Sequence, residues 1–373
     1  MDSSSTHHQK QKLYQILMLP WLGHGHVSPF LELAKRLVAM KNKNFQVFMC
    51  STPANLAPFK QKSTADNDDN LIQFIDLHLP SSSELPPDQH TTKNLPPHLM
   101  PVLKTAFDEA KDNFHGILRE LKPDILIYDF IQPWAALVAQ QESTPAVLFL
   151  TTSAASSAFI YHSAEFDDDY PIPGLEFVAN PRGELLKFLY DVSNGLTNKE
   201  RYFQCIGSSC GIILIKTLNE IEKNHIDYLS RLVRKDIVPV GPLVQGPENK
   251  SSDESFLKWL DQRKDSKAVF VSFGTEYFLS KEEIEEVAYG LELSNVSFIW
   301  VLRFPGSANV PREPGKLYRK EDVARVIREV VAEEKGDKVR KKVEEMSRTI
   351  KEKGDQVIDN AVEKLVQLVE DKP

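Results

Sequence analysis

The segment Tyr14–Leu37, YQILMLPWLGHGHVSPFLELAKRL, decides how the rest of the chain is interpreted. The apolar run Ile16–Leu19 predicts a buried strand, and the glycines of GHGH predict a tight turn after it. After Pro29, which suits the first turn of a helix, apolar residues recur at helical spacing. The segment therefore predicts a strand–turn–helix unit whose turn carries His24 and His26.

The turn histidine His26 has two interpretations. It is either a loop residue without chemistry, or a general base, because imidazole takes up protons near neutral pH. Gly23 and Gly25 leave room for a ligand to approach the backbone. Ligands of open α/β sheets bind at the carboxyl edge of the strands, which favours a functional role for His26.

Composition narrows the class of protein. A length of 373 residues predicts two domains, and 41% hydrophobic with 26% charged residues is typical of globular proteins. A net charge of −8 gives no electrostatic reason to expect nucleic acid or an anionic membrane as partner, and no apolar run has the length of a membrane span. Residues 1–12 lack the apolar core of a signal peptide and are expected to form a disordered tail. The three scattered cysteines predict no disulfide framework and favour a cytoplasmic location.

Strands alternate with helical segments along the first half of the chain. Further strands are predicted at Phe45–Ser51, Leu71–Leu79, Asp124–Tyr128 and Ala146–Leu150, a proline-rich loop at Pro80–Pro101 and an amphipathic helix at Val102–Leu121. Runs as apolar as DILIY and AVLFL suit central parallel strands covered on both faces. The pattern predicts an α/β fold with a doubly wound parallel sheet.

Polar residues follow two of these buried strands. Asp129 comes directly after one, and Thr151, Thr152 and Ser153 come after the next. Because the carboxyl ends of parallel strands share one edge, these residues are expected near His26. Asp129 alone is equally compatible with a helix cap or loop anchor; beside His26 it predicts a His–Asp pair.

The second half divides at a polar stretch. Strands at Gly211–Leu218 and Ile237–Leu243 are expected to complete a first lobe of residues 13–244, followed by a linker at 245–255 and a second lobe at 256–373. Strands are predicted in this second lobe at Lys267–Thr275 and Val296–Arg303, and a capping box at Ser280 and Glu283. Ser272, Gly274 and Thr275, at a strand end, suit a phosphate or a sugar, although they also fit an ordinary strand–turn.

Four motifs resemble one known family. Gly25–Pro29 (GHVSP), Ile127–Asp129 (IYD), Val238–Pro242 (VPVGP) and Val271–Thr275 (VSFGT) occur in this order in plant family 1 UDP-dependent glycosyltransferases. The resemblance covers nearly the whole chain. The segments Leu79–Pro80, His90–Thr92, Gln132–Trp134 and Gly274–Phe278 resemble the branch that adds a sugar to the sugar of an existing glycoside.

The resemblance implies a GT-B fold, with two Rossmann-like lobes, and an inverting, metal-independent transfer of a hexose, expected to be glucose, from a UDP-sugar. No other cofactor is implied, and a monomer is expected. His26 would be the general base, and Asp129 would orient its ring. By the same resemblance, the donor would be bound by Gly25, Thr151, Thr152, Ser272, Gly274 and Thr275, and the small-molecule glycoside acceptor by Trp21, His24, His90, Thr91 and Trp134.

One family feature is missing. The donor-binding box of the second lobe, rich in Trp, His and Cys, has no counterpart, because the chain has no Trp after Trp300, no His after His225 and no Cys after Cys210. Gly306–Ala308 (GSA) resembles an engineered junction, and a lost exon or a faulty gene model would look similar. From Gly315 the resemblance resumes, with helices expected at 320–334, 337–352 and 356–370.

Three functions follow from these observations. The first is a UDP-sugar-dependent glycosyltransferase, and the second is a truncated, catalytically impaired protein that binds the acceptor. The third, a dinucleotide enzyme, fits poorly, because GHGH is not the three-glycine fingerprint and no acidic ribose ligand is suitably placed.

Overall fold

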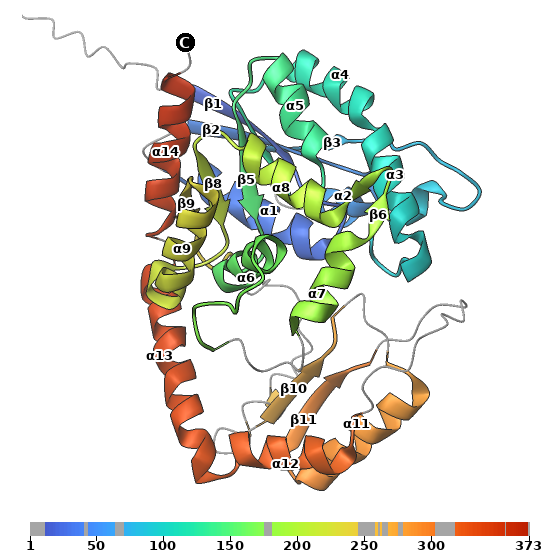
Figure 1. The fold of residues 1–373 in the computed structure, drawn as a ribbon, viewed down its shortest axis with the longest axis vertical. Coiled ribbons are helices and arrows are strands. Elements are labelled where there is room, and N and C mark those ends of the chain that lie inside the picture. The colour runs from blue at the N-terminus through green and yellow to red at the C-terminus, as the bar shows by residue number, and fades with distance from the viewer. Residues whose placement is uncertain are drawn as a thin grey trace, which may run out of the picture. The chain divides into compact units, whose positions relative to one another are not determined.

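Strand β1 (Leu13–Leu19) lies inside a seven-stranded sheet in which every strand pair is parallel (Figure 1). The strand order is β3 (Ile72–Asp76), β2 (Asn44–Ser51), β1, β4 (Ile125–Tyr128), β5 (Ala146–Leu150), β8 (Ile212–Ile215) and β9 (Asp236–Pro239). The order reverses direction at β1 and β4, so the loops after these two strands meet at a topological switch point. The doubly wound parallel sheet predicted from sequence is confirmed.

This computed structural model describes residues 12–40, 44–63, 71–174, 181–244, 258–259, 262, 268–274, 279–302, 318–354 and 356–371. The predicted tail up to residue 11, the linker, Thr275 and Gly306–Ala308 lie outside these ranges. The chain divides into two units, the first formed by residues 1–91, 98–244 and 352–373 and the second by residues 92–97 and 245–351.

The helices of the first unit cover both faces of its sheet. They are α1 (His24–Val38), α2 (Pro53–Ser63), α3 (Met100–Glu109), α4 (Lys111–Leu121), α5 (Pro133–Gln141), α6 (Ala154–Glu165), α7 (Pro181–Tyr190), α8 (Asn198–Ser208), α9 (Asn219–Val233) and α14 (Ile358–Glu370). Short elements are η1 (Pro87–Gln89), η2 (Pro97–Leu99), β6 (Val192–Ser193) and β7 (Leu196–Thr197). Successive strand residues point to opposite faces, so Ile125 and Ile127 join the core with α1 and α14 while the Tyr128 hydroxyl donates to the Cys205 carbonyl of α8.

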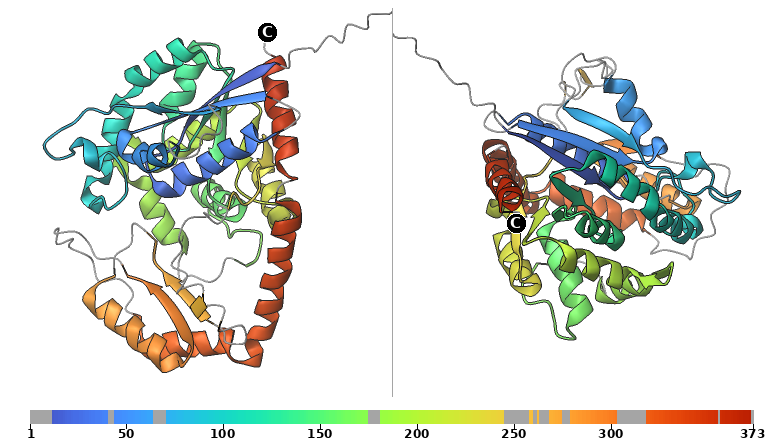
Figure 2. Two further views of the ribbon diagram at one scale, coloured as in Figure 1. Left: turned by 180° about the vertical axis from the view of Figure 1, so that it is seen from behind. Right: turned by 90° about the horizontal axis from the view of Figure 1, so that it is seen from above.

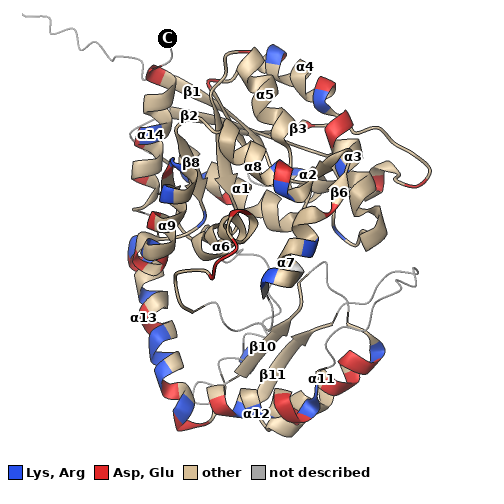
Figure 3. Cartoon of the chain, viewed as in Figure 1, with Lys and Arg blue, Asp and Glu red and all other residues tan. Residues whose placement is uncertain are grey.

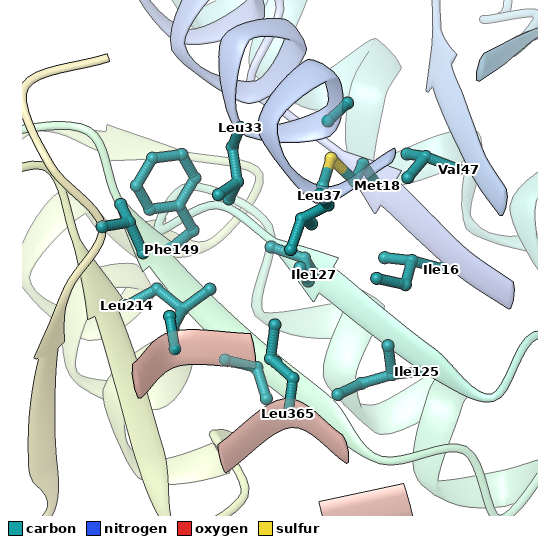
Figure 4. Packing of buried hydrophobic residues seen from close by; sticks show 14 of the residues in the cluster. Ile16, Met18, Leu33, Leu37, Val47, Ile125, Ile127, Phe149, Leu214 and Leu365 are labelled. Atoms are coloured by element: carbon teal, nitrogen blue, oxygen red, sulfur yellow. The ribbon is translucent and has the colours of Figure 1, made fainter. Parts of the chain in front are cut away.

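Helix α14 belongs to the core of the first unit. Its apolar side chains pack with α1 and with alternate residues of β1, β4 and β8, and Figure 4 shows Leu365 beside Ile125 and Leu214. Tyr14 of β1 donates to Glu370 over 2.7 Å, and Arg36 of α1 donates to the Gly354 carbonyl over 2.8 Å. The domain bounds predicted from sequence include this helix in the second lobe, whereas the family resemblance suggests that the final helix crosses back to the first lobe. Its buried face packs on the first unit's sheet, in agreement with the resemblance.

Helix α1 begins earlier than the sequence pattern predicts. The Gly23 carbonyl accepts the amides of His26 and Val27, each over 2.9 Å, so the turn passes directly into a helix that starts at His24. Pro29 lies one turn further inside. The two histidines therefore belong to the first helical turn and not to a loop, which holds their backbone in a regular geometry.

The predicted helix Val102–Leu121 is two helices. Ala110 has a ψ of 1°, which ends α3 and begins α4, although the amide of Phe114 still bonds to the Ala110 carbonyl. Because Phe107, Ala110 and Phe114 are all buried, the apolar periodicity continues across the break and hides it from pattern analysis.

The second unit is small. Its described part contains the parallel pair β10 (Ala268–Ser272) and β11 (Ser297–Val301), with α11 (Lys281–Ser294), α12 (Lys320–Val331), η3 (Glu334–Gly336) and α13 (Asp337–Lys353), which runs to the unit boundary. The capping box predicted at Ser280 and Glu283 is present at the start of α11. Phe270 is 67% exposed, so one face of this strand pair is poorly covered within the described part.

Helix α13 has no buried residue and carries charges along its length, as Figure 3 shows. Figure 2 gives two further views of the strands and helices of each unit. Among the helices that the structure describes, none has the length and apolarity needed to cross a membrane.

Candidate active site

His26 and Asp129 form a hydrogen-bonded pair at the carboxyl edge of the sheet. The His26 Nδ1 atom lies 2.8 Å from Asp129 Oδ2, and the histidine side chain is 22% exposed whereas the aspartate is fully buried. Helix α1 brings the histidine and the end of β4 brings the aspartate. The pairing expected from sequence is therefore present in the geometry, with the ring partly open and the carboxylate shielded.

Two backbone amides hold the Asp129 carboxylate in place. The amide of Phe130 donates to Oδ1 over 2.8 Å, and the amide of Trp21 donates to Oδ2 over 3.1 Å. A carboxylate that accepts backbone N–H groups keeps one orientation, and here that orientation presents Oδ2 to His26. Because Nδ1 faces Asp129, Nε2 is the ring nitrogen that points away from the carboxylate.

Thr151 contacts the same ring nitrogen of His26 as Asp129 does. Its hydroxyl is 3.1 Å from His26 Nδ1, and it follows β5, the neighbour of β4 in the sheet. The Thr152 hydroxyl instead pairs over 2.7 Å with the hydroxyl of Ser157 in the following helix, α6. Of the two predicted donor residues after β5, Thr151 contacts the His–Asp pair and Thr152 bonds to α6.

His24 and Gly25 are exposed beside the pair. The ring of His24 stacks near Phe59 of α2, with centroids 6.5 Å apart. A Cβ built at Gly25 would meet no atom within 4 Å, so the missing side chain leaves open space in front of α1. That space is compatible with both the predicted donor role of Gly25 and the predicted acceptor role of His24.

His90 and Thr91 are buried in a polar network. The Thr52 hydroxyl donates to the His90 carbonyl over 2.6 Å, and the Thr91 hydroxyl donates to Asn55 Oδ1 over 2.8 Å and to the Leu22 carbonyl over 3.3 Å. Burial lowers the pKa of His90 from its ordinary value. The network ties the proline-rich loop to α2 and to the segment that follows β1, two residues before His24.

Trp21 and Trp134 are buried in one aromatic cluster. Both rings pack edge-on against Phe107, with centroids 5.4 Å apart, and the Trp134 indole N–H donates to Asp108 over 3.0 Å. The fully buried Arg201 holds Asp108 with two further hydrogen bonds. The two tryptophans, both predicted to bind the acceptor, thus have structural partners of their own, and their acceptor role stays a prediction.

Ser272 and Gly274 belong to the second unit, whereas His26 belongs to the first. Gly274 has a φ of +78°, a region that favours glycine, and its amide is 3.4 Å from the Ser272 hydroxyl. This is a strand followed by a tight turn, and Thr275, the third predicted donor residue, lies outside the described residues.

Sequence reasoning missed Glu222. Its carboxylate accepts the amides of Ala154 and Ala155, each over 3.0 Å, at the start of the helix that follows Thr151. Glutamate is common in the first turn of a helix, and α9 has two there, so no sequence signal separates Glu222 from Glu220.

Comparison with known proteins defines the class first. Residues 14–245 match the family model described as "Glycosyltransferase, N-terminal domain", which is more than half of the chain. A solved UDP-glucosyltransferase from Polygonum tinctorium superposes with a TM-score of 0.71 at 18% identity, covering 97% of this chain and 100% of that one. The fold is that of the GT-B glycosyltransferases.

Sequence relatives then give the family. UDP-glucosyltransferase 29 of Panax ginseng is 38% identical, with 96% of this chain and 97% of that protein covered. The flavanone 7-O-glucoside 2''-O-beta-L-rhamnosyltransferase of Citrus maxima is 44% identical over 80% of this chain, but the chain spans only 65% of its length. The chain belongs to the plant UDP-dependent glycosyltransferase family.

The ginseng alignment also locates the difference in length. It extends over 447 positions although the chain has 373 residues, so the relative has residues with no counterpart here. Because 96% of this chain and 97% of the relative lie within that match, the residues without a counterpart fall inside the alignment.

Proposed function

We propose that this protein is an inverting glycosyltransferase that transfers a hexose, glucose in the first instance, from a UDP-sugar to a sugar hydroxyl of a small plant glycoside. The observation that carries the proposal is the His26–Asp129 pair, with its buried, doubly amide-bound carboxylate and its partly open ring. In this proposal His26 is the base and Asp129 the residue that orients it, and both lie at the carboxyl edge of the sheet, where ligands of open α/β folds bind.

The chemistry follows from the ring's orientation. His26 Nε2 takes the proton of the acceptor hydroxyl while that oxygen attacks the anomeric carbon and forms the new glycosidic bond. The bond from the anomeric carbon to the diphosphate oxygen breaks, and UDP leaves with its electron pair, so configuration at that carbon inverts. Asp129 stabilises the imidazolium formed on His26.

The names of relatives support the substrate classes. The ginseng relative is a UDP-glucosyltransferase, and the name of the Citrus relative gives a glucoside as acceptor. In the proposal, Thr151 and the space at Gly25 serve the donor sugar, and His24 serves the acceptor. We further propose that the protein works as a cytoplasmic monomer, without a metal ion or any cofactor beyond its co-substrate.

A second candidate function rests on the second unit. If the residues that have no counterpart here bind the donor in the relatives, the chain is an acceptor-binding protein with impaired transfer. The observation that favours this is the small described part of the second unit, with one strand pair whose Phe270 is largely exposed.

Calorimetric titration of UDP into the full chain separates the two candidates, because it needs no knowledge of the acceptor. Saturable binding supports the transferase and leads to an acceptor screen with UDP-glucose, whereas a folded protein that binds no UDP supports the acceptor-binding alternative.

Substitution of the base tests the mechanism. His26→Ala is expected to abolish transfer, while the control His78→Ala, at an exposed histidine of the same unit, is expected to keep it. Full activity of a folded His26→Ala protein would remove His26 as the base.

A further inference from the structure

Glu222 stands at the start of α9 but bonds to a different helix. Its two carboxylate oxygens accept the amides of Ala154 and Ala155, the first two residues of α6. Helices α6 and α9 pack side by side, as Figure 1 shows. The contact therefore joins the loop after β5 to the loop after β8, at the edge of the sheet that carries His26.

In this arrangement each of the first three backbone N–H groups of α6 has a hydrogen-bond acceptor. Its first three amides have no partner within the helix. The Glu222 carboxylate accepts the amides of Ala154 and Ala155, and the hydroxyl of the N-cap Ser153 accepts the amide of Ser156. The negative carboxylate also opposes the positive end of the helix dipole, which strengthens the contact.

The backbone of Glu222 departs from helical geometry to make this contact. Its φ of −125° and ψ of 25° interrupt α9 between two otherwise helical stretches. The Thr217 hydroxyl donates a further hydrogen bond to the same carboxylate. A carboxylate held by three donors from two segments is fixed in position, in contrast to Glu220, which is exposed on the same turn.

Ala154 and Ala155, which Glu222 binds, lie close in the chain to a residue that contacts the His26–Asp129 pair. Ala154 is three residues after Thr151, and the Thr151 hydroxyl lies 3.1 Å from His26 Nδ1. That distance depends on where the loop from β5 to α6 is anchored, because β5 ends at Leu150. Glu222, the N-cap Ser153 and the Thr152–Ser157 hydroxyl pair all anchor this loop to α6, and of these Glu222 is the one that ties it to another helix.

We propose that Glu222 is a positioning residue, which anchors the start of α6 and thereby sets the Thr151 hydroxyl against His26. Its kinetic consequence rests on the proposed function, because only a transferase has a turnover to be affected. Its structural consequence, the environment of the His26 ring nitrogens, does not.

The test compares ¹⁵N chemical shifts of the His26 ring nitrogens in the ¹⁵N-histidine-labelled full chain. Thr151→Val defines the change caused by loss of the hydroxyl. Glu222→Gln is expected to displace the His26 signals in the same direction, because an amide group cannot accept both N–H bonds. The control Glu220→Gln removes the same charge two residues earlier in α9 and is expected to leave the His26 signals unchanged.

A milder variant covers the case in which Glu222→Gln does not fold. Thr217→Val removes one donor to the carboxylate at almost constant volume, and a smaller displacement in the same direction is expected. Unchanged His26 signals in a folded Glu222→Gln protein, or in Thr217→Val where Glu222→Gln does not fold, overturn the proposal. So does an equal displacement in Glu220→Gln.

Kinetics give a second measurement. Glu222→Gln is expected to lower kcat about tenfold with little change in the acceptor KM, as a small misplacement near reacting groups does. Added to Thr151→Val it is expected to cause no further loss, whereas additive losses would refute action through Thr151. A wild-type chain without turnover would contradict the proposed function only, and the nitrogen shifts would still decide the role of Glu222.

Discussion

Replacement of Leu365 by alanine tests whether α14 is part of the first unit's core. Leu365 is 1% exposed and belongs to the core cluster that joins the buried side chains of α14 to those of the sheet (Figure 4). Buried leucine-to-alanine changes cost about 2–5 kcal/mol, and the cost is high where neighbours cannot collapse into the cavity. The neighbours here are strand residues such as Ile125 and Leu214, fixed by the sheet, so a loss of about 3 kcal/mol is expected.

The assay must report on the first unit alone, because a two-unit chain does not unfold in one step. Hydrogen exchange of the β4 and β5 peptides, followed by mass spectrometry, gives the free energy of opening of that sheet. Leu137→Ala, at a 46% exposed leucine of α5, is the matched control and is expected to stay within about 0.5 kcal/mol of wild type. A Leu365→Ala loss no larger than that of the control would refute the assignment of α14 to this core.

Three further predictions concern the site. Asp129→Asn presents an amide N–H to His26 Nδ1 and is expected to lower kcat by about 10²–10⁴-fold in a transfer assay, with unchanged kcat contradicting the orienting role. Because burial lowers the pKa of His90 below 6.5, the unfolded chain binds its proton more readily; the free energy of opening of the first unit should fall as the pH drops below about 6.5, and His90→Gln should flatten that part of the profile, measured by hydrogen exchange of the same peptides after correction for the intrinsic exchange rate. Trp134→Phe removes the indole bond to Asp108 and is expected to cost about 2 kcal/mol of the same opening free energy; a raised acceptor KM without loss of stability would instead favour contact with the acceptor.

The sheet and the His–Asp pair follow from the sequence because both depend on local pattern. Strands as apolar as Ile125–Tyr128 admit few alternatives, and parallel order brings the residues after them to one edge. Asp129 could therefore be paired with His26 before any coordinates were known.

Other features depend on contacts that no local pattern encodes. The start of α1 is set by the Gly23 carbonyl, and Pro29, the residue that signalled a helix start, lies inside the helix. Trp134 was assigned to the acceptor by resemblance, whereas its burial follows from Asp108 and Arg201, which come from other parts of the chain. The role of Glu222 depends in the same way on α6, nearly seventy residues earlier.

The position of α14 bears on what the chain can still do without the residues that its ginseng relative has in addition. Those residues are internal, and the family resemblance predicts them before α14. This helix supplies six buried residues to the core of the first unit, Ile358, Ala361, Val362, Leu365, Val366 and Val369. A chain that ended before α14 would expose the sheet face that these residues cover, at a cost of several buried aliphatic side chains. Retention of α14 thus preserves the unit that holds His26 and Asp129, whereas the family resemblance predicts the break near Gly306–Ala308, within the unit that carries Ser272 and Gly274. Acceptor binding and the His–Asp pair are therefore expected to withstand this difference better than donor binding, which makes UDP the more informative ligand to titrate first.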